Sequence, residues 1–323
     1  MRGAVDAVRG EVITVSDVGE FGLVKRVTAG LAPSASTLLG PGDDAAVVAT
    51  PDGRVVASTD LLVENRHFRR DWSTANDVGH KAAARSLADI AAMGALPSAL
   101  LVGLAVPGSC QLDWVDGLVA GLREECAQAG AAVAGGDVSS AEVITLAVTA
   151  LGDLQGRAPV TLAGARPGDL VAVAGRLGWA AAGLAVLSRG FRSPVQVVSA
   201  HRRPEPPYAE GPRAAEFGAT SMTDVSDSLI SDLGHIAEAS GVRVEIAGAR
   251  VDVPAKLREV GAALNVDPLV WVLTGGDDYA LAATFGKDTQ LSAAWSVIGA
   301  VVEGEGVRVD GRRWPVGGHE HFR

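Results

Sequence analysis

The sequence of 323 residues lacks the motifs that identify the most common nucleotide-using enzymes. It contains no G-x-x-x-x-G-K-[ST] segment, which excludes a P-loop enzyme, and it lacks the His-Arg-Asp and Asp-Phe-Gly motifs of protein kinases. A polyphosphate-binding protein without a P-loop lysine needs another source of positive charge. Metal ions held by carboxylates can supply that charge.

Cysteine occurs only twice, at Cys110 and Cys126. The spacing of this pair matches no zinc-binding pattern, and two thiols cannot form a disulfide framework. We expect both to be buried apolar residues, which is the common fate of free cysteine.

Long hydrophobic runs are also missing, although 48% of the residues are apolar and the mean hydropathy is +0.23. A membrane-spanning helix needs roughly 18 uninterrupted apolar residues. The most apolar window, Val171–Leu187, contains Arg176 and several glycines, and the segment Met1–Glu11 has no apolar signal core. The sequence therefore predicts a globular protein located in the cytoplasm.

Positive charge is in short supply, because 28 Lys and Arg face 38 Asp and Glu and the net charge is −10. An acidic surface repels a phosphate backbone, so nucleic acid is not an expected partner. The same acidity would repel a small phosphate-bearing substrate unless bound cations intervened.

Strand-like apolar runs alternate with helical segments, and the length is typical of two domains. The polar segment Gln155–Asp169 is the best linker, which divides the chain into residues 1–154 and 155–323. We expect an α/β (or α+β) fold. The expected helices are Asp77–Met93, Leu112–Ala129, Ala180–Ser188 and Ser226–Ser240. The expected strands and one loop are Ala45–Val48, Val55–Ser58, Leu100–Val106, Val143–Leu151, Val171–Ala174, Val242–Ile246 and the proline-rich loop Arg202–Pro212.

Aspartates recur beside glycine or small hydroxyl residues at the ends of apolar runs. Six places show this pattern: Gly42-Asp43-Asp44, Ser58-Thr59-Asp60, Asp89, Gly135-Gly136-Asp137, Asp224-Val225-Ser226-Asp227 and Gly275-Gly276-Asp277-Asp278. An aspartate at a strand end points into the crevice where α/β proteins bind ligands, and oxygen-only ligands suit Mg²⁺ or Ca²⁺. Each cluster alone also has an ordinary explanation, as a turn or a helix N-cap.

Two clusters illustrate the alternatives. Thr223, Asp224 or Ser226 could each cap the helix that follows. Asp89 lies four residues after Arg85 and eight after Lys81, so ion pairs along one helical face would explain it. Asp89 is nevertheless surrounded by apolar residues, and a buried carboxylate needs a partner or a metal.

In order and spacing, the motif blocks resemble thiamine-monophosphate kinases, a family of the PurM-like superfamily that includes aminoimidazole ribonucleotide synthetase. The resemblance covers nearly the whole chain, and it is the combination of blocks that is specific. The blocks are Gly19-Glu20-Phe21, Pro41-Gly42-Asp43-Asp44-Ala45, Ser58-Thr59-Asp60, Asn65-Arg66-His67-Phe68, Lys81-Ala82, Leu87-Ala88-Asp89-Ile90-Ala91-Ala92-Met93-Gly94, Gly135-Gly136-Asp137, Ala165-Arg166-Pro167-Gly168-Asp169, Asp224-Val225-Ser226-Asp227-Ser228-Leu229-Ile230-Ser231-Asp232-Leu233, Gly275-Gly276-Asp277-Asp278-Tyr279 and His321-Phe322.

The resemblance implies a two-domain PurM-like fold. Strands of the N-terminal domain would build a barrel at a homodimer interface, an α/β domain would follow, and ATP would lie in a cleft of the N-terminal domain near the partner. The resemblance also implies several Mg²⁺ ions, ATP as co-substrate and thiamine monophosphate as substrate.

Carried over position by position, the resemblance assigns three groups of residues. The metal ligands would be Asp44, Ser58, Thr59, Asp60, Asp89, Asp137, Asp224 and Asp227. The ATP contacts would be Gly136, Asp137 and Ser226. The contacts to thiamine monophosphate would be His67, Asp277 and His319.

The chain departs from the family pattern at several positions. Leu162 and Pro207 stand where arginine is common, and the arginine at the first of these would contact the ATP phosphates. Ser228 replaces a glycine, Asp277 replaces a glutamate that is one methylene longer, and His319 replaces a stacking Trp or Tyr. A leucine cannot grip phosphate, so we expect phosphate binding to differ there.

The expected reaction is direct in-line transfer of the γ-phosphoryl group of ATP to the phosphate of thiamine monophosphate, which gives thiamine diphosphate and ADP. The attacking phosphate oxygen is already ionised at pH 7, so alignment and charge neutralisation are needed and no general base is assigned.

Other functions stay open on the sequence. One is a superfamily enzyme with another acceptor, although no cysteine precedes Cys110 to support selenophosphate-synthetase chemistry. Another is a non-catalytic protein that binds Mg²⁺ and nucleotide. A metal phosphohydrolase would normally add histidine ligands, and the chain has only six histidines.

Overall fold

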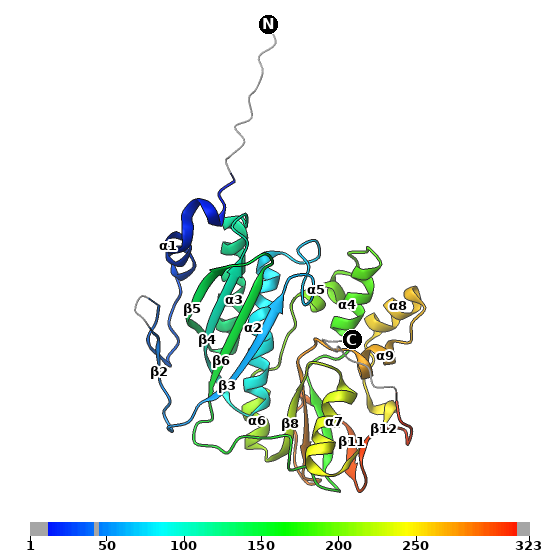
Figure 1. The fold of residues 1–323 in the computed structure, drawn as a ribbon. Helices are drawn as coiled ribbons and strands as arrows, with labels where there is room; N and C mark the ends of the chain where they lie inside the picture. Colours follow the sequence, from blue (N-terminus) through cyan, green and yellow to red (C-terminus); the bar gives the residue numbers. More distant parts are fainter. Residues whose placement is uncertain (1–11, 42–44, 315–323) are drawn as a thin grey trace.

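The first half of the chain forms a four-stranded sheet with two long helices on one face (Figure 1). The structure is a computed structural model that describes residues 12–41 and 45–314. In the sheet, β4 and β5 are parallel and the other neighbours are antiparallel. The strand order is β3 (Val56–Val63), β6 (Thr145–Asp153), β4 (Leu96–Val106) and β5 (Ala132–Ser140). The remaining elements are α1 (Val15–Thr28), β1 (Thr37–Leu39), β2 (Val47–Val48), α2 (Ala75–Ala92) and α3 (Leu112–Ala129).

Alternation along the strands determines which face of this sheet is covered. On β6, Leu146, Val148 and Ala150 are fully buried beneath α2 and α3, and the residues between them are only partly buried. The opposite face carries apolar side chains that stay accessible, with Leu61 on β3 56% exposed and Leu101 on β4 36% exposed. No helix covers this face in the described part of the chain, and its apolar side chains are more accessible than is usual for a monomer.

The second half forms a six-stranded sheet whose two faces are both covered. All six residues of its inner strand β10 are buried, as expected for a strand covered on both sides. Only the β9–β12 pair is parallel. The strand order is β12 (Gly306–Val309), β9 (Arg243–Ile246), β11 (Trp295–Val302), β7 (Leu170–Ala174), β10 (Ala280–Phe285) and β8 (Ala219–Val225). The helical elements are α4 (Trp179–Ser188), α5 (Val195–Arg202), α6 (Glu210–Glu216), α7 (Leu229–Ser240), the 3₁₀ turn Gly248–Arg250, α8 (Ala255–Leu264) and α9 (Pro268–Thr274).

Helix α2 joins the two sheets. Its residues Leu87 and Ile90 are fully buried in the core of the first sheet. At its C-terminal end, Ala92 packs in a second core with Ala214 of α6 and Phe285 of β10. The helix is thus packed against both halves of the molecule.

Several expectations about elements are confirmed, and others are wrong. The helix Leu112–Ala129 has its predicted bounds, residues 154–169 contain no helix or strand, and both cysteines are buried. The expected loop Arg202–Pro212 is wrong at its end, because α6 begins at Glu210 and accepts Pro212 in its first turn. Among the described residues, no helix combines the length and the apolar character that crossing a membrane requires.

The N-cap of α7 also differs from every alternative considered. The helix begins at Leu229, and its N-cap is Ser228, whose side chain accepts a hydrogen bond from the backbone N–H of Ser231 at 3.1 Å. Thr223 and Asp224 lie within β8. Asp224 is therefore available for a role other than capping.

Helices α2 and α3 approach so closely that Gly121 cannot carry a side chain. A Cβ atom there would lie 2.1 Å from the backbone oxygen of Asn76. In contrast, a Cβ atom at Gly234, inside α7, would meet nothing within 4 Å. The two glycines therefore differ in steric surroundings although both are helical.

We predict opposite effects of alanine at these two glycines. Gly121→Ala should lower the free energy of unfolding by about 3 kcal/mol because the helices must separate. Gly234→Ala should raise it by up to about 1 kcal/mol because alanine favours the helix. Urea denaturation followed by circular dichroism measures both, and equal effects of the two substitutions would contradict the packing described.

Candidate active site

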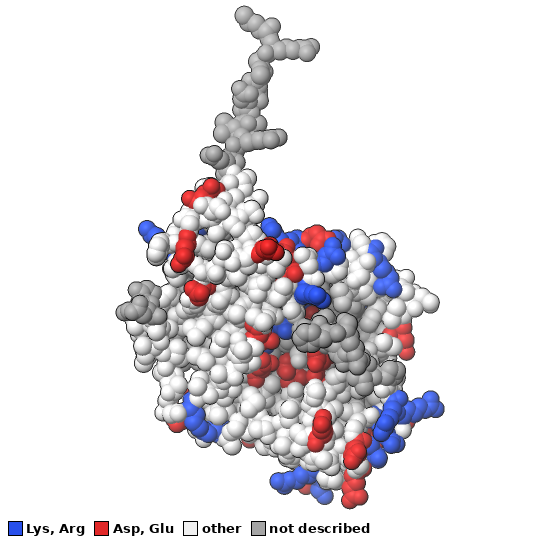
Figure 2. All heavy atoms as spheres, viewed as in Figure 1, with Lys and Arg blue, Asp and Glu red and all other residues white. Residues whose placement is uncertain are grey.

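Carboxylates from β3, α2 and β8 meet where the two sheets join. On β3, Ser58 and Asp60 are two residues apart and both face α2. The hydroxyl of Ser58 donates to the carboxylate of Asp89, and the hydroxyl of Ser86 donates to Oδ2 of Asp60 at 2.8 Å. Figure 2 shows acidic side chains gathered near the middle of one face, between the regions that carry β3 and α7 in Figure 1.

Asp224 of β8 completes this acid cluster, which we define as Asp60, Asp89 and Asp224. Asp224 is 9% exposed, and among the described residues its Oδ2 has no hydrogen-bond partner. A buried acceptor without a donor is costly, and a cation would remove that cost. The atoms that could bind a metal here are all carboxylate or hydroxyl oxygens, which suit a hard divalent ion such as Mg²⁺.

Burial, and to a smaller extent mutual repulsion, raises the pKa values of carboxyl groups in the acid cluster. Burial raises the pKa of Asp89 to about 6, and the nearby Asp60 adds to the rise while Ser58 and Arg85 oppose it. Burial also raises the pKa of Asp224 well above its ordinary value, with further increases from Asp89, Asp232 and Asp60. The protein therefore holds acids close together at a free-energy cost that ordinary surface carboxylates avoid.

The ion pairs that helical spacing predicts for Asp89 are absent from the described part of the chain. Arg85 pairs with Asp60, with 3.4 Å between Nη2 and Oδ1, and Lys81 pairs with Asp277, with 2.8 Å between Nζ and Oδ2. The explanation of Asp89 as a member of ion pairs along one helical face is therefore wrong. Both cations of α2 reach to other elements.

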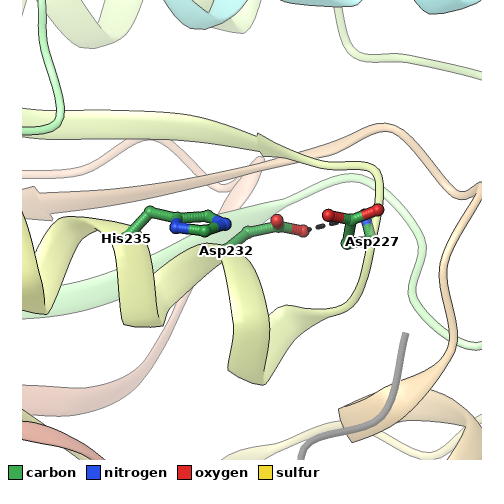
Figure 3. A group of neighbouring side chains, drawn as sticks. All are labelled: Asp227, Asp232 and His235. Carbon is green, nitrogen blue, oxygen red and sulfur yellow. Dashed lines mark hydrogen bonds between the residues drawn. The ribbon is translucent and has the colours of Figure 1, made fainter. Parts of the chain in front are cut away.

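A second group lies at the start of α7, beside the acid cluster. Asp232 accepts hydrogen bonds from the backbone N–H of Asp227 at 3.1 Å and of Ser228 at 3.0 Å, as Figure 3 shows for the first. Asp227, Asp232 and His235 each offer one ligand atom, and these atoms lie within 4.8 Å of one another. Burial raises the pKa of Asp232 to about 7, although the backbone donors oppose the rise.

The Gly275–Asp278 turn lies against the segment that follows β8. A Cβ atom at Gly276 would lie 2.4 Å from the backbone oxygen of Ser226, so only glycine permits this approach. Asp277, with φ 65°, donates its backbone N–H to Ser226 at 2.8 Å. Partial burial opposes the shift, but Lys81 lowers the pKa of Asp277 strongly, and His201 contributes to the same shift.

Asp278 has the structural role that turn aspartates often have. Its carboxylate accepts hydrogen bonds from the backbone N–H groups of Gly178 and Ala180, the latter at 2.8 Å, at the start of α4. Burial raises its pKa to about 7 although these donors oppose the rise. Asp278 is thus a cap, whereas Asp277 beside it faces Lys81.

Other predicted site residues lie apart from the acid cluster. The hydroxyl of Thr59 accepts a hydrogen bond from Thr149 at 3.1 Å, on the face of the sheet opposite to Asp60. Asp137 is exposed on β5, the edge strand opposite to β3, beside Gly103 of β4. His67 follows β3 and accepts a hydrogen bond at Nδ1 from the backbone of Val63 at 2.9 Å.

An apolar pocket of about 110 Å³ adjoins Gly136 and Asp137. Its walls come from α1, α3, β4 and β5, and include Val24, Leu118 and Val133. An apolar pocket with a few polar groups at its edge is a typical place for a flat organic ring.

Two predicted residues cannot be placed. Asp44, expected as a metal ligand, and His319, expected to stack on the substrate, lie outside the described residues. Sequence reasoning missed the contributions of Asp232, His235 and Tyr279. The position of Asp232, five residues after Asp227, could have indicated that the two lie close together. No sequence signal predicts the hydrogen bond of 2.9 Å between the hydroxyl of Tyr279 and Asp277.

Comparison with protein families defines the class of protein. Residues 42–154 match the N-terminal domain of AIR synthase related proteins, and residues 166–312 match their C-terminal domain. The two sheets described above are thus those of the two-domain AIR synthase related α/β fold.

Individual relatives narrow the class further. The thiamine-monophosphate kinase of Mycobacterium tuberculosis H37Rv is 46% identical over 303 residues, which cover 93% of this chain and 90% of the relative. A crystal structure of thiamine-monophosphate kinase from Stenotrophomonas maltophilia K279a has a TM-score of 0.77 at 31% identity, covering 90% of this chain and 94% of that one. The structure of AaThiL complexed with AMPPCP and TMP has a TM-score of 0.80 at 30% identity. The match covers 97% of this chain and 100% of that one. The chain belongs to the thiamine-monophosphate kinase family.

We predict that replacing Asp224 by Asn stabilises the metal-free protein at pH 8. The folded-state pKa of Asp224 lies above its unfolded value of about 3.9, so the wild type loses stability as pH rises from that value through the folded pKa. Asn cannot ionise, and the variant should be more stable by about 1–3 kcal/mol at pH 8 and by little near pH 4.

Urea denaturation in the presence of EDTA at pH 4, 6 and 8 measures this difference. The exposed Asp288, replaced by Asn, provides the control and should change stability by less than about 0.5 kcal/mol at each pH. A variant at position 224 that is less stable than the wild type at pH 8 would contradict the crowding of carboxylates.

Proposed function

We propose that the protein transfers the γ-phosphoryl group of ATP to the phosphate of thiamine monophosphate and releases thiamine diphosphate and ADP. The observation that carries this function is the similarity to thiamine-monophosphate kinases over 93% of the chain. The acid cluster supports it, because a reaction between two phosphate groups requires positive charge in a chain with no P-loop.

The chain's contribution to the reaction is alignment. The acceptor oxygen is ionised at neutral pH, so no side chain has to remove a proton from it. At about 4 Å, two unit charges repel by about 4 kcal/mol at an effective dielectric of about 20, and this repulsion must be offset. The packing of α2 against both sheets fixes the acids, so little reorganisation is needed during the reaction.

The acids fit a divalent metal, since they are buried oxygen donors and one oxygen of Asp224 has no partner among the described residues. The residues that would hold Mg²⁺ are Asp60, Asp89, Asp224 and Asp227, with Ser58 beside them. Mg²⁺, when bound there, would supply the charge that allows two anionic phosphates to approach. The number of ions and the contribution of Asp44 stay predictions.

The nucleotide base would enter the apolar pocket beside Gly136 and Asp137. Leu118 and Val133 offer apolar surface for the flat ring, and Asp137 at the edge would face the polar part of the nucleotide. On the substrate side, His67 and Asp277 are proposed to contact thiamine monophosphate. His319 and Ser226 stay predictions for the substrate and the nucleotide.

A homodimer is proposed on the uncovered face of the first sheet. Leu61 on β3 and Leu101 on β4 are exposed there, on the two strands that flank β6, and a second copy would cover them. Strand register places Thr59 on this face and Asp137 at its edge, so both would lie near the partner and apart from Asp60. We also propose that the strands of the two copies form a barrel, that the protein is located in the cytoplasm and that the domain boundary follows residue 154.

We predict that the purified protein forms thiamine diphosphate from thiamine monophosphate, ATP and Mg²⁺, and that Asp60→Asn and Asp137→Asn each abolish turnover. Each substitution removes a charge that the metal or nucleotide site needs. Separation of the thiamine compounds by chromatography measures the product, and circular dichroism shows whether each variant stays folded. A wild type that releases ADP only with another acceptor would overturn the function, and a folded variant with near-normal rate would remove its residue from the site.

Sedimentation tests the dimer separately. The wild type is expected to sediment as a dimer and Leu61→Glu as a folded monomer, because a charge would be placed in the interface. Leu184→Glu, at a residue 42% exposed on α4, is the control and should leave the dimer intact. A monomeric wild type, or a dimeric Leu61→Glu variant, would exclude this face as the interface.

A further inference from the structure

Helix α2 presents two cations, Lys81 and Arg85, at the junction of the two sheets. They lie one helical turn apart, and their side chains are only 3% and 15% exposed. Burial of a charge is costly unless the charged group finds partners. The two residues differ sharply in how far this requirement is met.

Lys81 is fully engaged. Its ammonium group lies 2.8 Å from Oδ2 of Asp277 and donates to the backbone oxygen of His201 at 3.3 Å. A carboxylate and a carbonyl from the second half of the chain thus satisfy it. Lys81 has a structural explanation and needs no ligand.

Arg85 is not satisfied to the same degree. Its hydrogen bond to a described residue is a long one, from Nη2 to Oδ1 of Asp60 at 3.4 Å. Its guanidinium carbon lies 6.0 Å from the centre of the Tyr279 ring, at the outer limit of a cation–π contact. Its Nε is buried and has no hydrogen-bond partner among the described residues. A guanidinium has five N–H donors, so several remain available to a ligand.

The position of Arg85 indicates which ligand that is. On one side lies Asp60, a member of the acid cluster proposed to hold the metal. On the other side lies Tyr279, whose hydroxyl donates to Oδ1 of Asp277 at 2.9 Å. Burial works against the charge of Arg85, but Tyr279, Asp277 and Asp60 together raise its pKa. A permanent cation therefore stands between the proposed metal site and the proposed substrate contact.

We propose that Arg85 binds the phosphate group of the acceptor, thiamine monophosphate, and holds it between the acid cluster and Asp277. The planar guanidinium matches two phosphate oxygens at once, which a point charge such as lysine cannot do. This role rests on the proposed function, and it adds a phosphate-binding side chain from the middle of α2. The guanidinium N–H groups that Asp60 leaves available would donate to the phosphate oxygens.

Three variants test the role. Arg85→Met removes the charge and keeps much of the apolar length, and Arg85→Lys keeps the charge without the planar fork. Arg157→Met is the matched control, because Arg157 is also largely buried at 23% exposure, pairs with Glu216 at 3.1 Å and has a buried Nε without a partner among the described residues. Arg157 contacts neither the acid cluster nor the Gly275–Asp278 turn in any described ion pair or hydrogen bond.

The decisive readout compares two ligands that differ by the phosphate. The affinities are measured by calorimetric titration with thiamine monophosphate and with thiamine, in the presence of Mg²⁺ and AMPPCP. Arg85→Met should bind thiamine monophosphate about tenfold or more weakly than the wild type, and thiamine less than about threefold more weakly. Arg85→Lys should lose affinity for thiamine monophosphate by a smaller factor, and Arg157→Met should match the wild type. Steady-state kinetics should show kcat lower by about 100-fold in Arg85→Met, with KM for ATP within about threefold.

Several results would overturn the proposal. Unchanged affinity for thiamine monophosphate, or an equal loss for both ligands in Arg85→Met, would show that Arg85 has only a structural role. If Arg85→Met fails to fold, the same comparison with Arg85→Lys decides. A wild type that makes no thiamine diphosphate refutes the proposed function, whereas a productive wild type with an indifferent Arg85→Met refutes this inference alone.

Discussion

The architecture depends on one unfavourable interaction that the surrounding packing tolerates, the mutual repulsion of Asp60, Asp89 and Asp224. These carboxylates come from a strand of the first sheet, from α2 and from a strand of the second sheet. They stay together because α2 is buried against both sheets, with Leu87 and Ile90 in one core and Ala92 in another. Hydrophobic burial supplies the free energy that holds the three carboxylates together.

The same helix also brings positive charge to the junction. Lys81 neutralises Asp277, and Arg85 stands between Asp277 and Asp60. A chain with a net charge of −10 thereby keeps two buried cations where anionic substrates are proposed to meet. Lys81 and Arg85 lie on successive turns of one helix, which sets the distance between them. Together with Asp277 and Asp60 they form one largely buried group of charges, unlike separate ion pairs on a surface.

Much of the fold could be predicted from local sequence signals, whereas the convergence of side chains could not. Leu112–Ala129 followed from its helical period and the terminating Gly130, which adopts a left-handed conformation. The pairing of Lys81 with Asp277 spans 196 residues, and no local pattern encodes it. Strand order decides that Asp137 lies on the opposite edge from Asp60, and strand alternation turns Thr59 away from Asp60 although the two are adjacent. The capping residue of α7 was missed because several hydroxyl and acidic residues precede that helix in a row.

We propose that the buried acids hold divalent cations. Crystals of the protein grown with Mn²⁺ and AMPPCP, measured at a wavelength where manganese scatters anomalously, test it most directly. The account predicts anomalous peaks within coordination distance of carboxylate oxygens of Asp60, Asp89 and Asp224. Peaks confined to other surfaces, with the three carboxylates free of metal, would contradict it.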